Sequence, residues 1–172
     1  MIKLLPLIAQ RESIRSYDPL RPLPETIINE ILEAGRLAPS AANLQPWTFW
    51  LISSKEMLEK VHNTYYRAWL IEAPHILIVT GNKKIAWTRA DGYNSLETDL
   101  TIAMDHMILA AENLGVGTCW VGNFNNALLR EILHLSVDEE VFAMTPLGYP
   151  KNGFVKTGKK IRKDLHEIVN RV

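Results

Sequence analysis

The 172-residue sequence has a single cysteine, Cys119, and no long apolar run. One cysteine cannot form an intrachain disulfide, which fits a reducing compartment. The apolar N-terminal stretch is too short for a secretory signal peptide, and no apolar run reaches membrane-spanning length. We therefore expect a cytoplasmic protein with no membrane partner.

An excess of charge of one sign is also absent. The chain carries 19 basic and 19 acidic residues, so its formal net charge is zero. Because nucleic-acid binders normally carry a basic excess, we expect no nucleic-acid partner. The C-terminal region 151–172 is nevertheless rich in lysine and arginine. Two interpretations of that region stay open at this point, a solvated surface and a site for an anion.

Catalytic signatures built on side chains are missing as well. The histidines show neither metal-ligand spacing nor a cluster with Cys119, so no metal site is predicted. The glycine-rich run 115–122 fails the dinucleotide-binding spacing, and it follows a helical pattern instead of preceding one. An enzyme without an evident acid, base or nucleophile fits a reaction whose chemistry belongs to a bound cofactor.

Length and apolar periodicity predict one domain over residues 1–172, built from mixed helices and strands. Segments with helical periodicity predict helices over 24–37, 55–70, 97–114 and 127–133. Apolar and β-branched runs predict strands over 47–52, 75–80, 118–121 and 141–147. Breaker residues predict a loop over 81–95.

Polar side chains alternate along a short segment near the N-terminus, at Arg11, Ser13 and Arg15. In an extended chain alternate side chains share one face, so these three would point the same way. The planar guanidinium group suits phosphate and carbonyl oxygens. The segment therefore predicts binding of a long anionic, hydrogen-bonding ligand.

A second segment, Pro39 to Trp47, follows a helix pattern and precedes a predicted strand. One interpretation of its amide side chains, Asn43 and Gln45, is that they favour a turn. They could also form hydrogen bonds with the edge of a heterocycle, because an amide both donates and accepts. Together with the first segment, it favours a cradle for a phosphorylated, planar cofactor.

Four motifs occur in order along the chain: Arg11-x-Ser13-x-Arg15, Pro39-Ser40-x-x-Asn43-x-Gln45-Pro46-Trp47, Gly115-x-Gly117-Thr118-Cys119-Trp120-Val121-Gly122-Asn123-Phe124, and Pro146-Leu147-Gly148-Tyr149-Pro150 followed by a basic stretch. These motifs resemble those of the nitroreductase family of FMN-dependent oxidoreductases, over nearly the whole chain. The resemblance implies an α+β, three-layer α/β/α fold with a central, mostly antiparallel sheet. It also implies an intertwined homodimer with the FMN sites at its interface.

The resemblance implies a role for each part of the site. The arginine–serine row would hold the phosphate, the ribityl chain and the pyrimidine edge, and the second segment would come from the partner subunit. The stretch after the glycine run would line the flavin ring, with backbone N–H directed at N5, and a late basic pair would meet the phosphate. The cofactor-binding residues expected on this basis are Arg11, Ser13, Arg15, Pro39, Ser40, Ala41, Asn43, Gln45, Trp120, Val121, Gly122, Lys160 and Arg162.

The implied activity is an NAD(P)H oxidoreductase that uses NADH or NADPH as donor and reduces an electron-poor small molecule, such as a nitroaromatic or a quinone. No side chain is expected to be catalytic, and Arg15 is expected to stabilise negative charge on the reduced flavin. The alternatives are another flavin-dependent reaction (dehydrogenation, dehalogenation or flavin cleavage), an FMN-binding protein without turnover, and a scaffold without cofactor.

Two departures from the family pattern stand out. The chain is short, and the region before the long helix is compact, where longer members shape the substrate pocket with extra helices. The segment Tyr65–Trp69 is aromatic where family members often place polar flavin contacts, so Tyr66 or Arg67 are candidates for that contact.

Overall fold

The computed structural model describes residues 3–172, and its described strands form one antiparallel sheet in the order β1-β2-β3. The strands are β1 (Trp47–Ile52), β2 (His75–Asn82) and β3 (Glu139–Leu147). The central strand β2 is buried from His75 to Gly81. This explains why its sequence is a continuous apolar run and does not alternate with polar residues.

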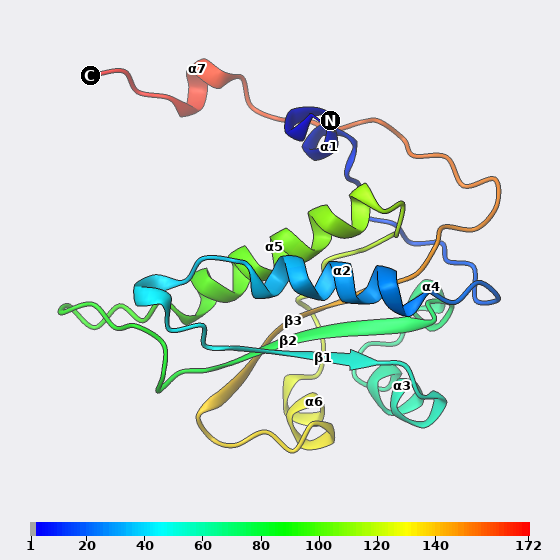
Figure 1. The fold of residues 1–172 in the computed structure, drawn as a ribbon, viewed down its shortest axis with the longest axis horizontal. Helices are drawn as coiled ribbons and strands as arrows, with labels where there is room; N and C mark the ends of the chain where they lie inside the picture. Colours follow the sequence, from blue (N-terminus) through cyan, green and yellow to red (C-terminus); the bar gives the residue numbers. More distant parts are fainter. Residues whose placement is uncertain (1–2) are drawn as a thin grey trace.

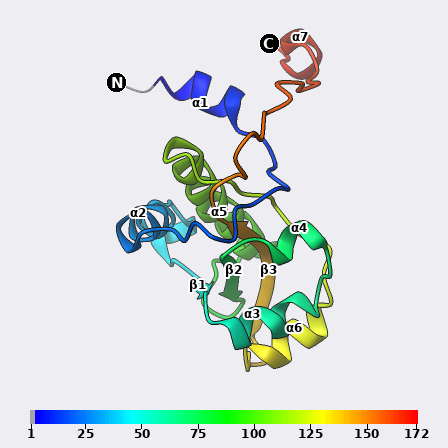
Figure 2. The ribbon, with the colours of Figure 1, turned by 90° about the vertical axis from the view of Figure 1, so that its right-hand side faces the viewer.

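Helices cover both faces of the sheet, as Figures 1 and 2 show. On one face lie α2 (Glu25–Arg36) and α5 (Leu96–Asn113), which pack against the side of β2 that carries Leu77 and Val79. On the other face lie α3, α4 and α6, which pack against Ile76 and Ile78. The expected three-layer α+β architecture is confirmed. The helices of the second face are α3 (Lys55–His62), α4 (Ala68–Ile71) and α6 (Asn126–Ile132).

The sheet continues beyond β3 through isolated backbone bridges. Residue Val121 pairs with Met144 of β3, and Ser13 pairs in parallel with Thr118. We call residues 11–15 the arginine segment. It therefore lies next to residues 118–121, which run along the edge of β3.

Both chain ends carry short helices on the outside of the molecule. The helices α1 (Leu4–Gln10) and α7 (Leu165–Ile168) lie at the top of Figure 1, on the side away from the sheet. Neither contains a buried residue. Several apolar side chains of these helices face solvent, including Leu5, which is 78% exposed, and Leu165, which is 68% exposed. None of the described helices is long and apolar enough to cross a membrane.

Two sequence-based element predictions are wrong. The helix expected over 55–70 is interrupted, because α3 ends at His62 and a turn follows in which the Thr64 hydroxyl donates to the Val61 carbonyl over 2.7 Å. The strand expected over 118–121 forms only isolated bridges. There the Cys119 N–H donates to the Thr145 side chain over 3.0 Å, so a regular backbone ladder does not form.

Candidate functional site

The arginine segment is extended and held beside residue 118. The Ile14 N–H donates to the Thr118 carbonyl over 2.8 Å. Ile14 is buried, whereas Ser13 and Arg15 on either side of it are exposed. This alternation places the polar side chains of the segment on the solvent side, as the sequence pattern predicts.

A buried tyrosine supports this segment from below. The Tyr17 hydroxyl donates to the Ile14 carbonyl over 2.6 Å, and its ring is fully buried. Burial raises the pKa of the phenol well above its usual value, so the hydroxyl stays protonated and remains a donor. The close packing continues at Gly148, where an added Cβ would lie 2.7 Å from Pro74 and 3.2 Å from the Tyr17 ring.

The stretch from residue 120 to 122 is anchored on β3 and leaves one backbone edge open. Two backbone hydrogen bonds, 2.9 and 3.1 Å long, join Val121 to Met144. The Trp120 ring packs edge-on against Phe142, with centroids 5.6 Å apart. A Cβ added at Gly122 would meet no other atom within 4 Å, so a ligand can approach this backbone closely.

Cations gather where the C-terminal region crosses the N-terminal segment. The Lys160 ammonium donates to the Ile8 carbonyl over 2.8 Å. Partial burial, together with the charges of Arg11 and Arg162, lowers the pKa of Lys160. Burial is the larger cause of this shift, and the like charges of Arg11 and Arg162 add to it; an anion bound between the three cations would relieve their repulsion.

The second predicted segment forms a strained loop, which includes the short 3-10 helix η1 (Ala41–Asn43). The carboxylate of Asp99, only 2% exposed, accepts from the Ala41 N–H over 2.9 Å and from the Ser95 hydroxyl over 2.8 Å. The Ser40 hydroxyl oxygen accepts from the Gln45 N–H over 2.9 Å. Three residues of the loop have left-handed φ values: Ala42 at 51°, Asn43 at 56° and Gln45 at 48°.

The two predicted segments lie at opposite ends of α5 within one chain, as Figure 1 shows. The loop is attached at Asp99, in the first turn of the helix. The arginine segment lies at the other end, where Lys156 pairs with Glu112 and donates to the Gln10 carbonyl over 3.3 Å. The helix rises about 20 Å between Asp99 and Glu112, at about 1.5 Å per residue.

The predicted residues thus fall into two groups. One group lies around the arginine segment and the other lies in the loop at the start of α5. The first group contains Arg11, Ser13, Arg15, Trp120, Val121, Gly122, Lys160 and Arg162, and the second contains Pro39, Ser40, Ala41, Asn43 and Gln45.

One aromatic side chain beside the arginine segment is missing from the predicted set. The Arg15 guanidinium carbon lies 6.0 Å from the centroid of the Trp69 ring. Arg67 instead lies over Tyr65 and donates to the Tyr66 carbonyl. The aromatic character of Tyr65–Trp69 was the only sequence signal for this contact.

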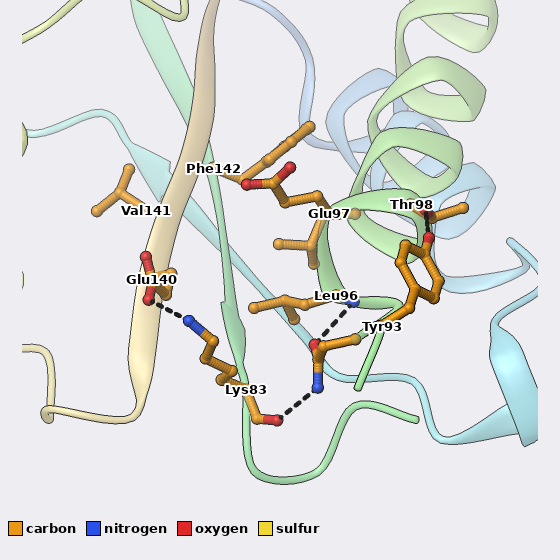
Figure 3. A pocket seen from close by; sticks show the side chains of 10 residues that line it. Lys83, Tyr93, Leu96, Glu97, Thr98, Glu140, Val141 and Phe142 are labelled. Atoms are coloured by element: carbon orange, nitrogen blue, oxygen red, sulfur yellow. Dashed lines mark hydrogen bonds and ion pairs between the residues drawn. The ribbon is translucent and has the colours of Figure 1, made fainter. Parts of the chain in front are cut away.

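Two hollows adjoin these groups. A cavity of about 360 Å³ lies between β3 and the start of α5, and Figure 3 shows Glu97 extending across it toward Phe142. Its rim carries the ion pair between Lys83 and Glu140, 3.4 Å long. A more open hollow of about 260 Å³ borders the loop and is lined by Pro39, Ser40, Ala41, Trp87, Tyr93, Ser95, Thr98, Asp99 and Ile102. Within residues 3–172 no group of three or more His, Cys, Asp or Glu side chains could hold a metal ion.

Two groups of relatives are similar to this chain in sequence, one with nitroreductase names and one with deiodinase names. A candidate NADH dehydrogenase/NAD(P)H nitroreductase of Archaeoglobus fulgidus is 34% identical, over 99% of this chain and 94% of its own. An iodotyrosine deiodinase of Daphnia pulex is 28% identical over 93% of this chain, which spans 63% of that longer protein.

Solved structures match the fold closely. The crystal structure of a nitroreductase family protein from Clostridium difficile has a TM-score of 0.89 and 31% identity, and the match covers 98% of each chain. A candidate nitroreductase in complex with FMN from Desulfovibrio desulfuricans has a TM-score of 0.81 and 25% identity, over all of this chain and 98% of its own. The family profile described as "Nitroreductase family" matches residues 8–64 and 53–149. The chain therefore belongs to the nitroreductase family.

Proposed function

We propose that this protein is an FMN-dependent NAD(P)H oxidoreductase that works as a homodimer, with each FMN held between two copies of the chain. The observation that carries the proposal is the continuity of one surface. The cations around Arg11 and Lys160 lead through Ser13, which is paired with Thr118, to the open backbone edge at Gly122. Such a surface fits a ligand with an anion at one end and a flat ring at the other.

The side chains of the first group would each bind a different part of the cofactor. Arg11, Lys160 and Arg162 would bind the phosphate, and the exposed Ser13 hydroxyl would meet the ribityl chain. Hydrogen bonds to charged groups contribute about 1.5–3 kcal/mol each, so three approach the roughly 8 kcal/mol of a micromolar ligand. Bound FMN would supply the hydride exchange between the nicotinamide donor and the acceptor.

Arg15 would place a cation at the pyrimidine end of the ring, with its guanidinium near Trp69. A fixed positive charge there favours the reduced, more negative cofactor. Arg15→Ala should therefore lower the flavin midpoint potential, and Arg15→Lys should restore part of it. An unchanged potential in the alanine variant would remove Arg15 from this role.

A second copy of the chain is needed to bring the loop to the same cofactor. The loop and the arginine segment are separated by about 20 Å of helix within one chain. The exposed apolar side chains of α1 and α7, such as Leu5 and Leu165, also favour burial against another molecule.

The acceptor would enter beside the ring. The cavity of Figure 3 adjoins Trp120 through Phe142, and its volume of about 360 Å³ falls within the range of small-molecule sites. Val141 and Phe142 line one wall and Glu97 extends across the cavity, which would suit a compact ring with polar substituents, such as a quinone or nitroaromatic.

The absorbance spectrum of the purified protein, followed during anaerobic titration with NADH and then NADPH, tests this proposal. We expect a bound flavin whose absorbance is bleached by a nicotinamide and returns when an electron-poor acceptor is added. A colourless protein that cannot be reconstituted with FMN would overturn it. A flavin that is bleached but not reoxidised by any acceptor would indicate a binding protein without turnover.

Reductive dehalogenation is a second candidate, favoured by the similarity to the iodotyrosine deiodinase of Daphnia pulex. It predicts that neither nicotinamide bleaches the flavin. It also predicts that chemically reduced protein releases iodide from an iodinated phenol. Iodide release measured under both conditions separates the two candidates.

A further inference from the structure

An acidic side chain, Glu12, lies within the cationic segment and is not explained by binding of an anion. It follows Arg11 and precedes Ser13. Its carboxylate accepts three hydrogen bonds from one short stretch of the C-terminal region. These come from the Thr157 N–H over 3.1 Å, the Thr157 hydroxyl over 3.1 Å and the Gly158 N–H over 2.6 Å.

The stretch that Glu12 binds lies just before two cations of the C-terminal region, Lys160 and Arg162. Gly158 has a φ of 65°, a left-handed conformation that glycine adopts without strain. Lys160 and Arg162 follow directly, and Lys160 reaches the Ile8 carbonyl. We call residues 157–162 the strap. Glu12 fixes the turn from which the strap delivers these cations.

Charge repulsion opposes this arrangement. Lys160 lies close enough to Arg11 and Arg162 for their charges to lower its pKa. Burial by itself would raise the pKa of Glu12, but hydrogen bonds from Gly158 and Thr157 outweigh it and hold that pKa below its ordinary value. Glu12 is therefore ionised at neutral pH, and it supplies attraction where the neighbouring cations repel.

We propose that Glu12 is a positioning residue that latches the strap over the phosphate end of the cofactor. The latch makes the protein select phosphorylated flavin over flavin without phosphate. The inference rests on the proposed function, because it takes the phosphate of FMN as the anion between Arg11, Lys160 and Arg162. Glu12 faces the strap and does not touch the anion, so its effect passes through the position of the cations.

The test compares the affinities of wild type, Glu12→Ala and Glu12→Gln for FMN and for riboflavin, measured by quenching of flavin fluorescence. Wild type should bind FMN at least tenfold more tightly than riboflavin. Glu12→Ala should lose about tenfold in FMN affinity, with riboflavin affinity changed less than twofold. The FMN affinity of Glu12→Gln should lie between those of wild type and Glu12→Ala, because the amide oxygen can accept only some of the three hydrogen bonds.

The matched control is Glu56→Gln, which removes the same charge from a carboxylate that pairs only with Lys60 of its own helix. It should leave both affinities unchanged. Trypsin cleavage within residues 157–163 provides a second readout. FMN should protect this region in wild type and not in Glu12→Ala.

Equal loss of both flavin affinities in Glu12→Ala and Glu12→Gln would overturn the latch, because it would show general structural support. Unchanged FMN affinity in Glu12→Ala would also overturn it. In both cases wild type still binds FMN and the proposed function stands. Wild type that binds neither flavin would overturn both proposals.

Discussion

The arginine segment and the loop at the start of α5 are held in different ways. The arginine segment is held against the core, because the Ile14 N–H donates to the Thr118 carbonyl and the buried Tyr17 packs beneath it. The loop is attached to the rest of the chain through the buried carboxylate of Asp99, and it contains residues with left-handed backbone conformations. One half of the candidate site is thus part of the core, whereas the other depends on a few hydrogen bonds that oppose backbone strain.

The largest effect is expected from Asp99→Ala. This change leaves the Ala41 N–H and the Ser95 hydroxyl without their acceptor. Each group left without its partner costs about 1–3 kcal/mol, so we expect the free energy of unfolding to fall by about 2–6 kcal/mol and FMN affinity to fall with it. Urea unfolding and flavin titration measure the two effects.

Asp99→Asn is the control for that change. Its amide oxygen can still accept from Ala41, so it should recover a large part of the stability and of the FMN affinity. If Asp99→Asn and Asp99→Ala lose the same stability and the same FMN affinity, the contact to Ala41 does not hold the loop.

A smaller loss of stability is expected from Gly148→Ala, in the part of the site that contains the arginine segment. The added Cβ would lie 2.7 Å from Pro74, so packing must shift, at about 1–3 kcal/mol. Gly122→Ala is the matched control, because the added Cβ would meet no atom within 4 Å beyond its chain neighbours. It should leave stability within about 0.5 kcal/mol of wild type and still weaken FMN binding, since the methyl group occupies the approach to the ring. Unimpaired FMN binding by Gly122→Ala would contradict a close approach there.

The smallest effect is a pH dependence of stability. Burial lowers the pKa of His62 and of His75, and for His75 the charge of Glu25 offsets part of the shift. The unfolded chain therefore takes up protons more readily, so stability is complete above about pH 6.5 and falls as the pH drops through the folded pKa values. His75 pairs with Leu147, which is next to Gly148. Acid should therefore destabilise the part of the candidate site that contains the arginine segment.

Urea unfolding of wild type and His75→Gln between pH 7.5 and pH 5 measures this dependence. The variant should show the shallower fall in stability toward acid. Equal slopes in the two proteins would exclude His75 as a source of the pH dependence.

The elements with long, regular patterns were predictable from sequence. α2, α5 and α6 begin and end within one residue of the predicted bounds, and β2 and β3 extend the predicted strands by two residues at one end. Their periodicity reflects burial on one or both faces, which local sequence records. The break after His62 has no glycine or proline to mark it. The hydrogen bond that the Cys119 N–H donates to the Thr145 hydroxyl interrupts the strand at Cys119 and leaves no local pattern.

The candidate site was predictable in its parts and not in its arrangement. The alternation of Ser13, Ile14 and Arg15 is a local property of extended chain, so the sequence reveals it. The separation of the loop from the arginine segment depends on the length and placement of α5. The hydrogen bond that the Gly158 N–H donates to Glu12 joins residues 146 positions apart, which no local pattern encodes.

Mixing two defective variants tests most directly whether each site is built from two chains. One variant carries Arg11→Ala and Arg15→Ala, and the other carries Asn43→Ala and Gln45→Ala. Each alone should bind almost no FMN. When they are unfolded together and refolded at equal amounts, random pairing puts about half of the chains in mixed dimers, each with one intact site. FMN should then fill about one quarter of all sites.

The matched control carries all four substitutions on one chain and is mixed with wild type at equal amounts. With sites shared between chains, only wild-type dimers bind, and about one quarter of all sites should fill with FMN. Sites built within one chain would give about one half in this control and almost no binding in the first mixture. That pair of results would contradict a flavin site shared between two copies.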